Sequence, residues 1–259
     1  MSSTLRTQFV TLAWRSIRRT LRQPALLVPS FLFPLILLAV NVGGLDAATK
    51  IPGFPTDSYL DFALAISFVQ GALFAVSNAG TDLARDVQTG FMSRLSLTPV
   101  RGAALLAGQL AGPTVLGLVQ ALVFLSVGLI AGAKLESGLG GALVLLALAV
   151  LIAMAFSALG AFIALRTGSG EAVQGFFPLL FVLLFLSSMS LPRDLIEIDW
   201  FQTVATYNPV SYLIEAMRSL FIVGWDGEAL ALGFGLALVI FVVALTMASA
   251  ALRTRLVRT

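Results

Sequence analysis

The sequence contains no cysteine and no histidine. Without cysteine, the chain can form neither a disulfide bond nor a thiolate nucleophile. Without histidine it has no imidazole general base, and the common zinc sites, which use histidine and cysteine ligands, are excluded as well. These two absences rule out many classes of enzyme. We expect the chain itself to bind no metal ion and no cofactor.

Charged residues are also scarce. Only 11% of the 259 residues are charged, 58% are hydrophobic, and the mean hydropathy is +0.98. A soluble domain averages about 25% charged residues, so this composition is typical of a polytopic membrane protein. The net charge of +3 does not indicate a nucleic-acid partner, because the basic residues cluster beside apolar runs. We therefore predict a single all-α transmembrane domain over residues 1–259, surrounded by membrane lipid.

Six apolar runs approach or exceed the roughly 20 residues that a helix needs to cross a membrane. We predict transmembrane helices at 24–44, 59–80, 103–133, 139–165, 172–191 and 229–252. The third and fourth runs are separated at 134–138, because the combined run is too long for one helix and contains a Lys, a Glu and a Gly at that point. In the third run, Gly108 and Gly112 are expected to allow close helix packing within the chain.

A basic amphipathic helix is predicted before the first span, within residues 1–23. One of its faces is apolar, and the opposite face carries Arg15, Arg18, Arg19 and Arg22. Such a helix lies in the membrane interface, either as a simple anchor among anionic headgroups or against an acidic protein surface. The pattern alone leaves both interpretations open.

The distribution of Lys and Arg predicts the orientation of the chain. Twelve of the 16 basic residues lie at the N-terminus, in the loops after the second and fourth spans, and at the C-terminus. The other four are Lys50, Lys134, Arg193 and Arg218. Because cytoplasmic segments are enriched in Lys and Arg, we expect both termini in the cytoplasm and the protein in the plasma (inner) membrane.

The polar stretch 82–102, DLARDVQTGFMSRLSLTPVRG, separates the second and third spans. Asp82 is a candidate N-cap, and Gly90 would allow a sharp turn between two short helical pieces. Phe91, Met92 and Leu95 then share one face of a short helix that Pro99 would end. This helix either docks onto a partner protein or rests on lipid headgroups, and periodicity favours neither.

A longer segment, 192–228, joins the last two predicted spans, and its acidic residues outnumber its two arginines. Within it, Asn208 and Pro209 form a typical N-cap and first helical position. The helix predicted at 208–222 is too short to cross a bilayer, so it should lie at the outer surface or dip into the membrane and return. This helix also carries Tyr212, Glu215 and Arg218.

Two signatures of independent transport are missing. The sequence has no GxxxxGK[ST] motif, so the chain does not bind ATP through a P-loop. Proton- or sodium-coupled carriers usually need a carboxylate near the membrane midplane, whereas Asp61 is predicted near the external end of its span. An autonomous secondary carrier is therefore disfavoured.

Polar and aromatic side chains in the second and fifth spans are candidates to line a substrate path. The second span carries a polar stripe that could line a path or hydrogen-bond between helices, the commoner use of such residues. The fifth span is rich in phenylalanine, which suits an apolar passenger and equally suits lipid contact. The candidate path residues in these two spans are Ser67, Gln70, Phe74, Asn78, Gln174, Phe177 and Phe181.

Taken together, these features resemble the ABC-2 type permeases, membrane subunits of ATP-driven exporters that include daunorubicin-resistance and polysaccharide-export permeases. Two stretches carry the resemblance most specifically. The first is RDVQTGFMSRLSLTPVRGAALLAGQL, and the second is NPVSYLIEAMRSL, which is similar to the family's pattern of Asn-Pro, an aromatic, an acidic residue and Arg. The basic N-terminal helix and the six spans extend the similarity over nearly the whole chain.

The resemblance implies a function for the 82–102 stretch, namely that it is a coupling helix seated in a separate ATPase subunit. The implied coupling residues are Asp82, Arg85, Asp86, Gly90, Phe91, Met92, Arg94, Leu95, Pro99 and Arg101. It also implies two copies of the permease with two P-loop ATPase subunits, which would bind the ATP and Mg²⁺. The implied substrate path is lined by the first, second and fifth spans, and the first span adds Phe33 and Asn41 to the candidate path residues. We expect export of a hydrophobic small molecule. Export of a lipid-linked glycan or lipid is the first alternative, and an ATPase-independent channel or scaffold is the second.

Overall fold

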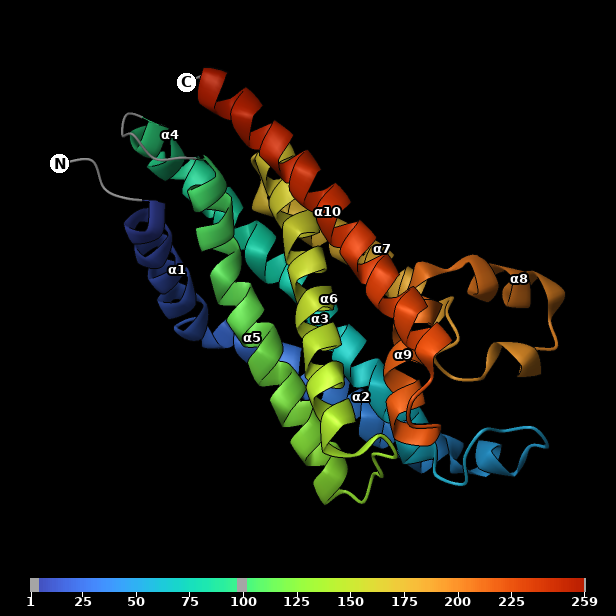
Figure 1. Cartoon of the computed structure of the whole chain (residues 1–259). Helices are drawn as coiled ribbons and strands as arrows, with labels where there is room; N and C mark the ends of the chain where they lie inside the picture. The colour runs from blue at the N-terminus through green and yellow to red at the C-terminus, as the bar shows by residue number, and fades with distance from the viewer. Residues whose placement is uncertain (1–4, 97–101, 259) are drawn as a thin grey trace.

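The computed structural model describes residues 5–96 and 102–258, and the described part of the chain contains helices and no strands (Figure 1). The helices are α1 (Leu5–Leu21), α2 (Pro24–Leu45), α3 (Tyr59–Gln88), α4 (Phe91–Ser96), α5 (Gly102–Ile130), α6 (Gly138–Thr167), α7 (Gly170–Phe185), α8 (Asp199–Tyr207), α9 (Pro209–Ile222) and α10 (Gly227–Arg258). Short 3-10 helices follow α2 at Asp46–Lys50 and precede α8 at Arg193–Leu195.

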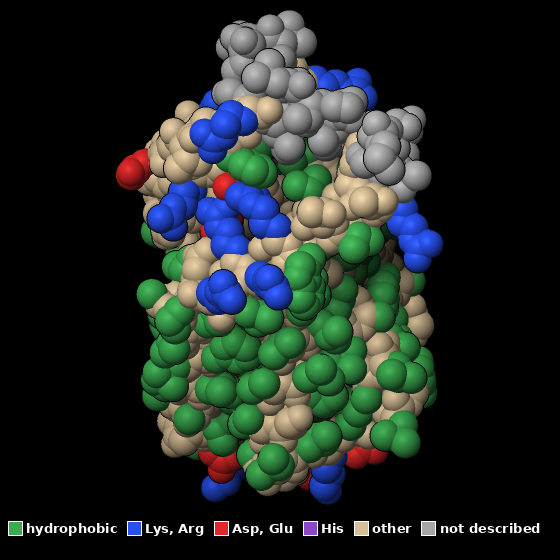
Figure 2. Space-filling model, turned by 90° about the vertical axis from the view of Figure 1, so that its left-hand side faces the viewer, with side chains coloured by type: hydrophobic (Ala, Val, Ile, Leu, Met, Phe, Trp, Pro, Cys, Tyr) green, Lys and Arg blue, Asp and Glu red, His purple; other side chains and the backbone are tan. Residues whose placement is uncertain are grey.

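The long helices form one bundle whose two ends differ in charge. Figure 1 shows α1, α4 and the C-terminus at one end, which we call the basic end, and α8 and the loop after α2 at the other, which we call the far end. Figure 2 shows a broad band of hydrophobic side chains between an end rich in Lys and Arg and an end with both acidic and basic side chains. This band is the surface expected of a protein that crosses a membrane.

Among the described residues, five helices are long and apolar enough to span a membrane: α2 with the 3-10 helix after it, α3, α5, α6 and α10. They match five of the six predicted spans, and the predicted break at 134–138 is confirmed. The match fails in the fifth span. Helix α7 has 16 residues, about 24 Å of helix, which is shorter than the roughly 30 Å hydrocarbon core.

The predicted helix at 172–191 was therefore wrong at its C-terminal end. After Phe185 the chain reads LSSMS, and the hydrogen bonds made by Ser187 and Ser188 do not continue the helix. The hydroxyl of Ser187 donates to the carbonyl of Leu184 (2.5 Å), and the backbone N–H of Ser188 donates to the hydroxyl of Ser211 (3.1 Å). Serine side chains that compete for backbone groups favour helix ends over helix interiors.

Helix α3 is the innermost helix, and 89% of its most apolar 18-residue window is buried. It contacts α2, α5, α6, α7 and α9. It begins at Tyr59 and is capped by Ser58, whose side chain accepts a hydrogen bond from the N–H of Asp61. It then continues without a break to Gln88, eight residues beyond the predicted end at 80. The prediction that Asp82 caps a new helix was therefore wrong, since Asp82 lies within α3.

Glycine allows two close helix crossings in the bundle. Gly108 and Gly112 of α5 face α1, where a Cβ on Gly112 would approach Ser16 and Thr20 within 2.7 Å. The prediction that this pair packs within the chain is confirmed. At the second crossing, Gly160 of α6 lies so close to α3 that a Cβ would overlap the backbone carbonyl of Val76.

A first prediction follows from the crossing of α3 and α6. Gly160→Val should lower the stability of the purified protein by about 1–3 kcal/mol, because the added side chain meets backbone that cannot move aside. The matched control is Gly43→Val in α2, where nothing lies within 4 Å of the position of a Cβ. Thermal unfolding in detergent measures the effect, and equal midpoints for the two variants would contradict the close crossing.

Candidate functional site

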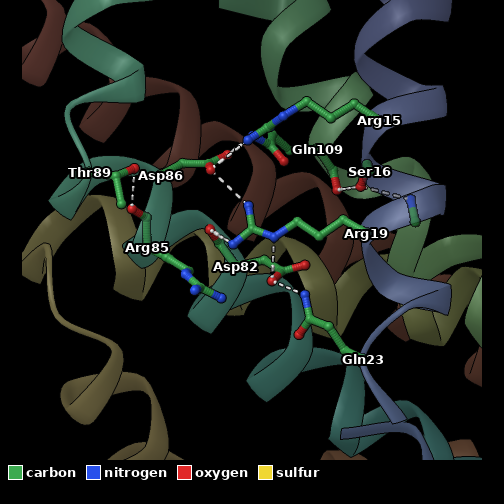
Figure 3. Close-up of polar contacts among 10 residues, drawn as sticks. Arg15, Ser16, Arg19, Gln23, Asp82, Arg85, Asp86, Thr89 and Gln109 are labelled. Carbon is green, nitrogen blue, oxygen red and sulfur yellow. Dashed lines mark hydrogen bonds and ion pairs between the residues drawn. The ribbon is translucent and has the colours of Figure 1, made fainter.

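A network of ion pairs at the basic end joins α1 to the last two turns of α3 (Figure 3). Arg15 forms a two-pronged contact with Asp86, its two terminal nitrogens donating to Oδ2 at 2.9 Å and to Oδ1 at 2.7 Å. Arg19 reaches both acidic residues, with its Nη1 2.7 Å from Asp86 Oδ1 and its Nε 2.9 Å from Asp82 Oδ1. Such bidentate, charge-assisted pairs are among the stronger polar contacts in proteins.

Three amide and hydroxyl side chains complete this network, which we call the α1–α3 lock. Gln23 donates to Asp82 (2.9 Å), and Gln109 of α5 donates to Asp86 (2.6 Å). The hydroxyl of Ser16 donates to the carbonyl of Gln109 (2.8 Å). Asp86 is only 3% exposed and receives four hydrogen bonds, so its charge is fully compensated. The hydrogen bond to Asp86 also raises the pKa of Arg15, although burial opposes the shift.

The lock engages two of the predicted coupling residues within the chain. Asp82 and Asp86 point toward α1, so their carboxylates serve to bind this helix. Sequence reasoning recognised the basic face of α1 and allowed an acidic protein surface as its partner, but it did not identify that surface. One signal was present, because Arg15 and Arg19 share the four-residue spacing of Asp82 and Asp86, which places each pair on one side of its helix.

Beyond the lock, α4 is held to the bundle by a tight turn. Gly90 has φ +69°, as predicted for a turn residue there, and its carbonyl accepts from the N–H of Arg94 (3.1 Å). Met92 is buried, and the guanidinium of Arg15 lies 4.0 Å from the centroid of the Phe91 ring. Two of the three residues predicted for the apolar face of α4, Phe91 and Met92, thus contact the rest of the bundle.

The remaining predicted coupling residues differ in their environment. Arg85 and Arg94 are exposed to solvent. Pro99 and Arg101 lie outside the described residues, and so does the side chain of Leu95. The predicted end of α4 at Pro99 therefore stays a prediction.

Four phenylalanines of the predicted substrate path meet in one cluster. Phe33 of α2 contacts Phe181 of α7 with ring centroids 5.5 Å apart, and Phe74 of α3 contacts Phe177 at 5.1 Å. Phe33 and Phe74 are 6.1 Å apart, as are Phe74 and Phe181, while Phe177 and Phe181 are 5.0 Å apart. The first, second and fifth predicted spans thus converge here, and Phe33 remains 40% exposed.

The polar candidates of the path are scattered by comparison. Ser67, Gln70 and Asn78 are buried in α3, and the amide nitrogens of Gln70 and Asn78 have no hydrogen-bond partner within the described structure. Asn41 is half-buried, and the exposed Gln174 donates to Thr81 (3.3 Å). The structure therefore brings together the aromatic part of the predicted path.

Helix α9 packs inside the protein near the far end, against α3 and α10. Its predicted cap is confirmed, because the side chain of Asn208 accepts from the N–H of Val210 (2.9 Å) and Pro209 follows it. Arg218 is 6% exposed and donates to the carbonyls of Phe62 (3.0 Å), Ser188 (3.1 Å) and Met189 (3.1 Å). Most apolar residues of this helix are buried against the rest of the protein.

A second ion pair holds the loop before α8 to α9. Glu215 pairs with Arg193 (2.6 Å) and accepts from the hydroxyl of Ser188 (2.8 Å). The guanidinium of Arg193 also lies 4.7 Å from the centroid of the Tyr212 ring. The predicted external residues thus form a packing cluster. No group of three acidic side chains suited to a metal ion occurs in residues 5–96 and 102–258.

This architecture is that of a helical membrane protein, and comparison with known proteins assigns its family. Residues 7–222 match the ABC-2 type transporter family, so the chain belongs to that family. It is similar to the probable doxorubicin resistance ABC transporter permease protein DrrC of two Mycobacterium tuberculosis strains, CDC 1551 / Oshkosh and ATCC 25618 / H37Rv. Each is 28% identical over 162 residues, which is 62% of this chain and 58% of the relative. The match thus spans little more than half the length of these relatives.

The lock generates a second prediction. Asp86→Ala should lower the free energy of unfolding by about 3 kcal/mol, the lower end of the cost of breaking a buried ion pair, since Arg15 is partly solvent-exposed. Arg85→Ala on the same helix removes an exposed side chain and should change stability little. Denaturant titration in mixed micelles measures the free energy of unfolding of both variants. If Asp86→Ala loses no more of it than Arg85→Ala, the lock does not stabilise the packing of α1.

Proposed function

We propose that this protein is the membrane subunit of an ABC exporter that moves hydrophobic small molecules outward, powered by separate P-loop ATPase subunits. Membership of the ABC-2 family is the observation that carries the proposal. The ATPases would bind the ATP and Mg²⁺, because this chain has no P-loop motif. The protein would lie in the plasma membrane with its basic end and both termini in the cytoplasm, in agreement with its Lys and Arg distribution.

The coupling contact is proposed at α4. This helix lies at the basic end beside α1 and the C-terminus, and Arg94 on it is exposed. Movement of an ATPase bound there would pass to α3 through the turn at Gly90 and to α1 through the lock. Because Arg15 contacts both Asp86 and Phe91, α1, α3 and α4 are linked at one point. Coupled domain movements need packed contacts of this kind.

The passenger is proposed to pass the aromatic cluster of Phe33, Phe74, Phe177 and Phe181. Aromatic walls suit apolar and aromatic ligands. The similar DrrC proteins are named for doxorubicin resistance, which favours a drug-like passenger over a lipid-linked glycan or lipid. A second copy would complete the path, since α2 and α7 expose apolar side chains beside the cluster, among them Leu32, Ile36, Leu179 and Val182.

A third prediction tests coupling. Arg94→Glu should abolish most ATP-driven transport of a fluorescent hydrophobic dye in inverted vesicles, because a reversed charge at the docking surface weakens the ATPase contact. The protein should remain folded, since Arg94 is exposed. Lys50→Glu, an exposed charge reversal near the far end, is the matched control and should transport normally.

Co-purification, combined with the dye-transport assay, separates the alternatives. Co-purification of a P-loop ATPase with the unmodified protein, and its loss in Arg94→Glu, would support the exporter. If the chain purifies without such a partner and still conducts the dye, the channel or scaffold interpretation replaces it. Normal transport by Arg94→Glu with an intact ATPase complex would contradict docking at α4.

A fourth prediction concerns the passenger. Phe181→Ala should reduce transport of the dye several-fold while leaving ATPase binding intact, because it removes the ring that contacts three other members of the cluster. Phe185→Ala, one turn further along α7 and 53% exposed, is the control. Equal transport by the two variants would argue against a path at the cluster, and transport of a labelled lipid instead of the dye would favour the lipid alternative.

A further inference from the structure

An apolar groove of about 560 Å³ lies at the basic end, on the face where α5 packs between α1 and the α6–α10 pair. Its walls are Phe9 of α1, Ala107 and Ala111 of α5, and Phe241 and Leu245 of α10, with Met154 of α6 also contributing. Figure 1 shows α6 between α5 and α10 on this side of the bundle. The volume lies within the range of roughly 300–1,000 Å³ that is usual for ligand sites.

The groove is long enough for an acyl chain. On α5 its lining runs from Ala103 to Val115, a rise of about 18 Å. This length is close to the depth of one leaflet, half of a hydrocarbon core about 30 Å thick. On α1, whose Phe9 lines the groove, Val10 and Trp14 are 54% and 56% exposed, so this helix exposes further apolar surface. Lipid chains cover such surfaces in a membrane.

Two arginines from different helices lie about one helical turn away from residues that line the groove. Arg6 lies three residues before Phe9 on α1, and Arg253 lies four residues after Ser249 on α10, and both Phe9 and Ser249 line the groove. Residues at these spacings share a helix face. Both arginines are exposed, and both lie toward the basic end, where α1 begins and α10 ends.

We propose that this groove binds one anionic glycerophospholipid, with an acyl chain along α5 and the phosphate between Arg6 and Arg253. The occupant must be apolar over the depth of one leaflet and negatively charged at one end. Those two requirements match a phospholipid and match neither a soluble anion nor an uncharged drug. The lipid would connect α1 to α10, two helices that the lock does not join, and the site does not depend on the proposed exporter function.

The probe is phosphatidylglycerol in competition with phosphatidylcholine. The purified protein would be placed in nanodiscs containing equal amounts of the two lipids and released for native mass spectrometry. We expect each chain to retain one phosphatidylglycerol in preference to phosphatidylcholine. Arg6→Gln and Arg253→Gln should each lower this preference about fivefold, since one arginine near anionic lipid contributes an attraction of that order. Arg22→Gln, an exposed arginine at the other end of α1, should not.

Filling the groove provides an independent test. Ala111→Trp should abolish the retained lipid, whereas Leu122→Trp on the exposed surface of the same helix should not. Ala107→Phe gives the same readout should Ala111→Trp fail to fold. Equal retention of the two lipids by the unmodified protein would overturn the assignment of an anionic occupant. Equal lipid loss in the groove-filling and control variants would overturn the groove as the site.

Discussion

Asp82 and Asp86 lie on the most buried helix of the bundle, and the compensation of their charges determines how the basic end is built. A carboxylate enclosed by protein is costly unless cations and donors surround it. Helix α1 supplies the cations Arg15 and Arg19, and further hydrogen bonds come from Gln23, just beyond α1, and from Gln109 of α5. An N-terminal helix that could have lain on lipid headgroups is therefore held against α3, and the small surfaces of Gly108 and Gly112 let α5 approach it closely.

Hydropathy and helix-capping signals predicted the positions of most of the long helices and the start of α9. The hydrocarbon thickness imposes a minimum length on spanning helices, so the apolar runs located α2, α5, α6 and α10 to within a few residues. Asn208 and Pro209 located the start of α9 because cap and first-turn preferences are local. Long-range pairing is different in kind. Arg15 and Asp86 are 71 residues apart in the sequence. The one signal of their contact was that Arg15 and Arg19 are spaced four residues apart, as are Asp82 and Asp86.

The two errors at helix ends have related causes. The stretch 172–191 is apolar enough for a span, but average hydropathy does not register that Ser187 and Ser188 bond elsewhere and end α7. The backbone carbonyls that follow α7 find partners elsewhere, because those of Ser188 and Met189 accept hydrogen bonds from the buried Arg218 of α9. Conversely, the charges of Asp82 and Asp86 suggested a loop, whereas partners on α1 allowed α3 to continue. In both places tertiary hydrogen bonds outweighed the local pattern.

The same contacts bear on how force would travel under the proposed exporter function. A six-residue helix has little stability alone, because helix nucleation is unfavourable at that length. Helix α4 is instead fixed by the burial of Met92 and by the contact of Phe91 with Arg15. Arg15 also binds Asp86, so displacement of α4 must either break this shared contact or carry α1 and α3 with it. Because α3 contributes Phe74 to the aromatic cluster, the second outcome would connect the basic end directly to the candidate substrate path.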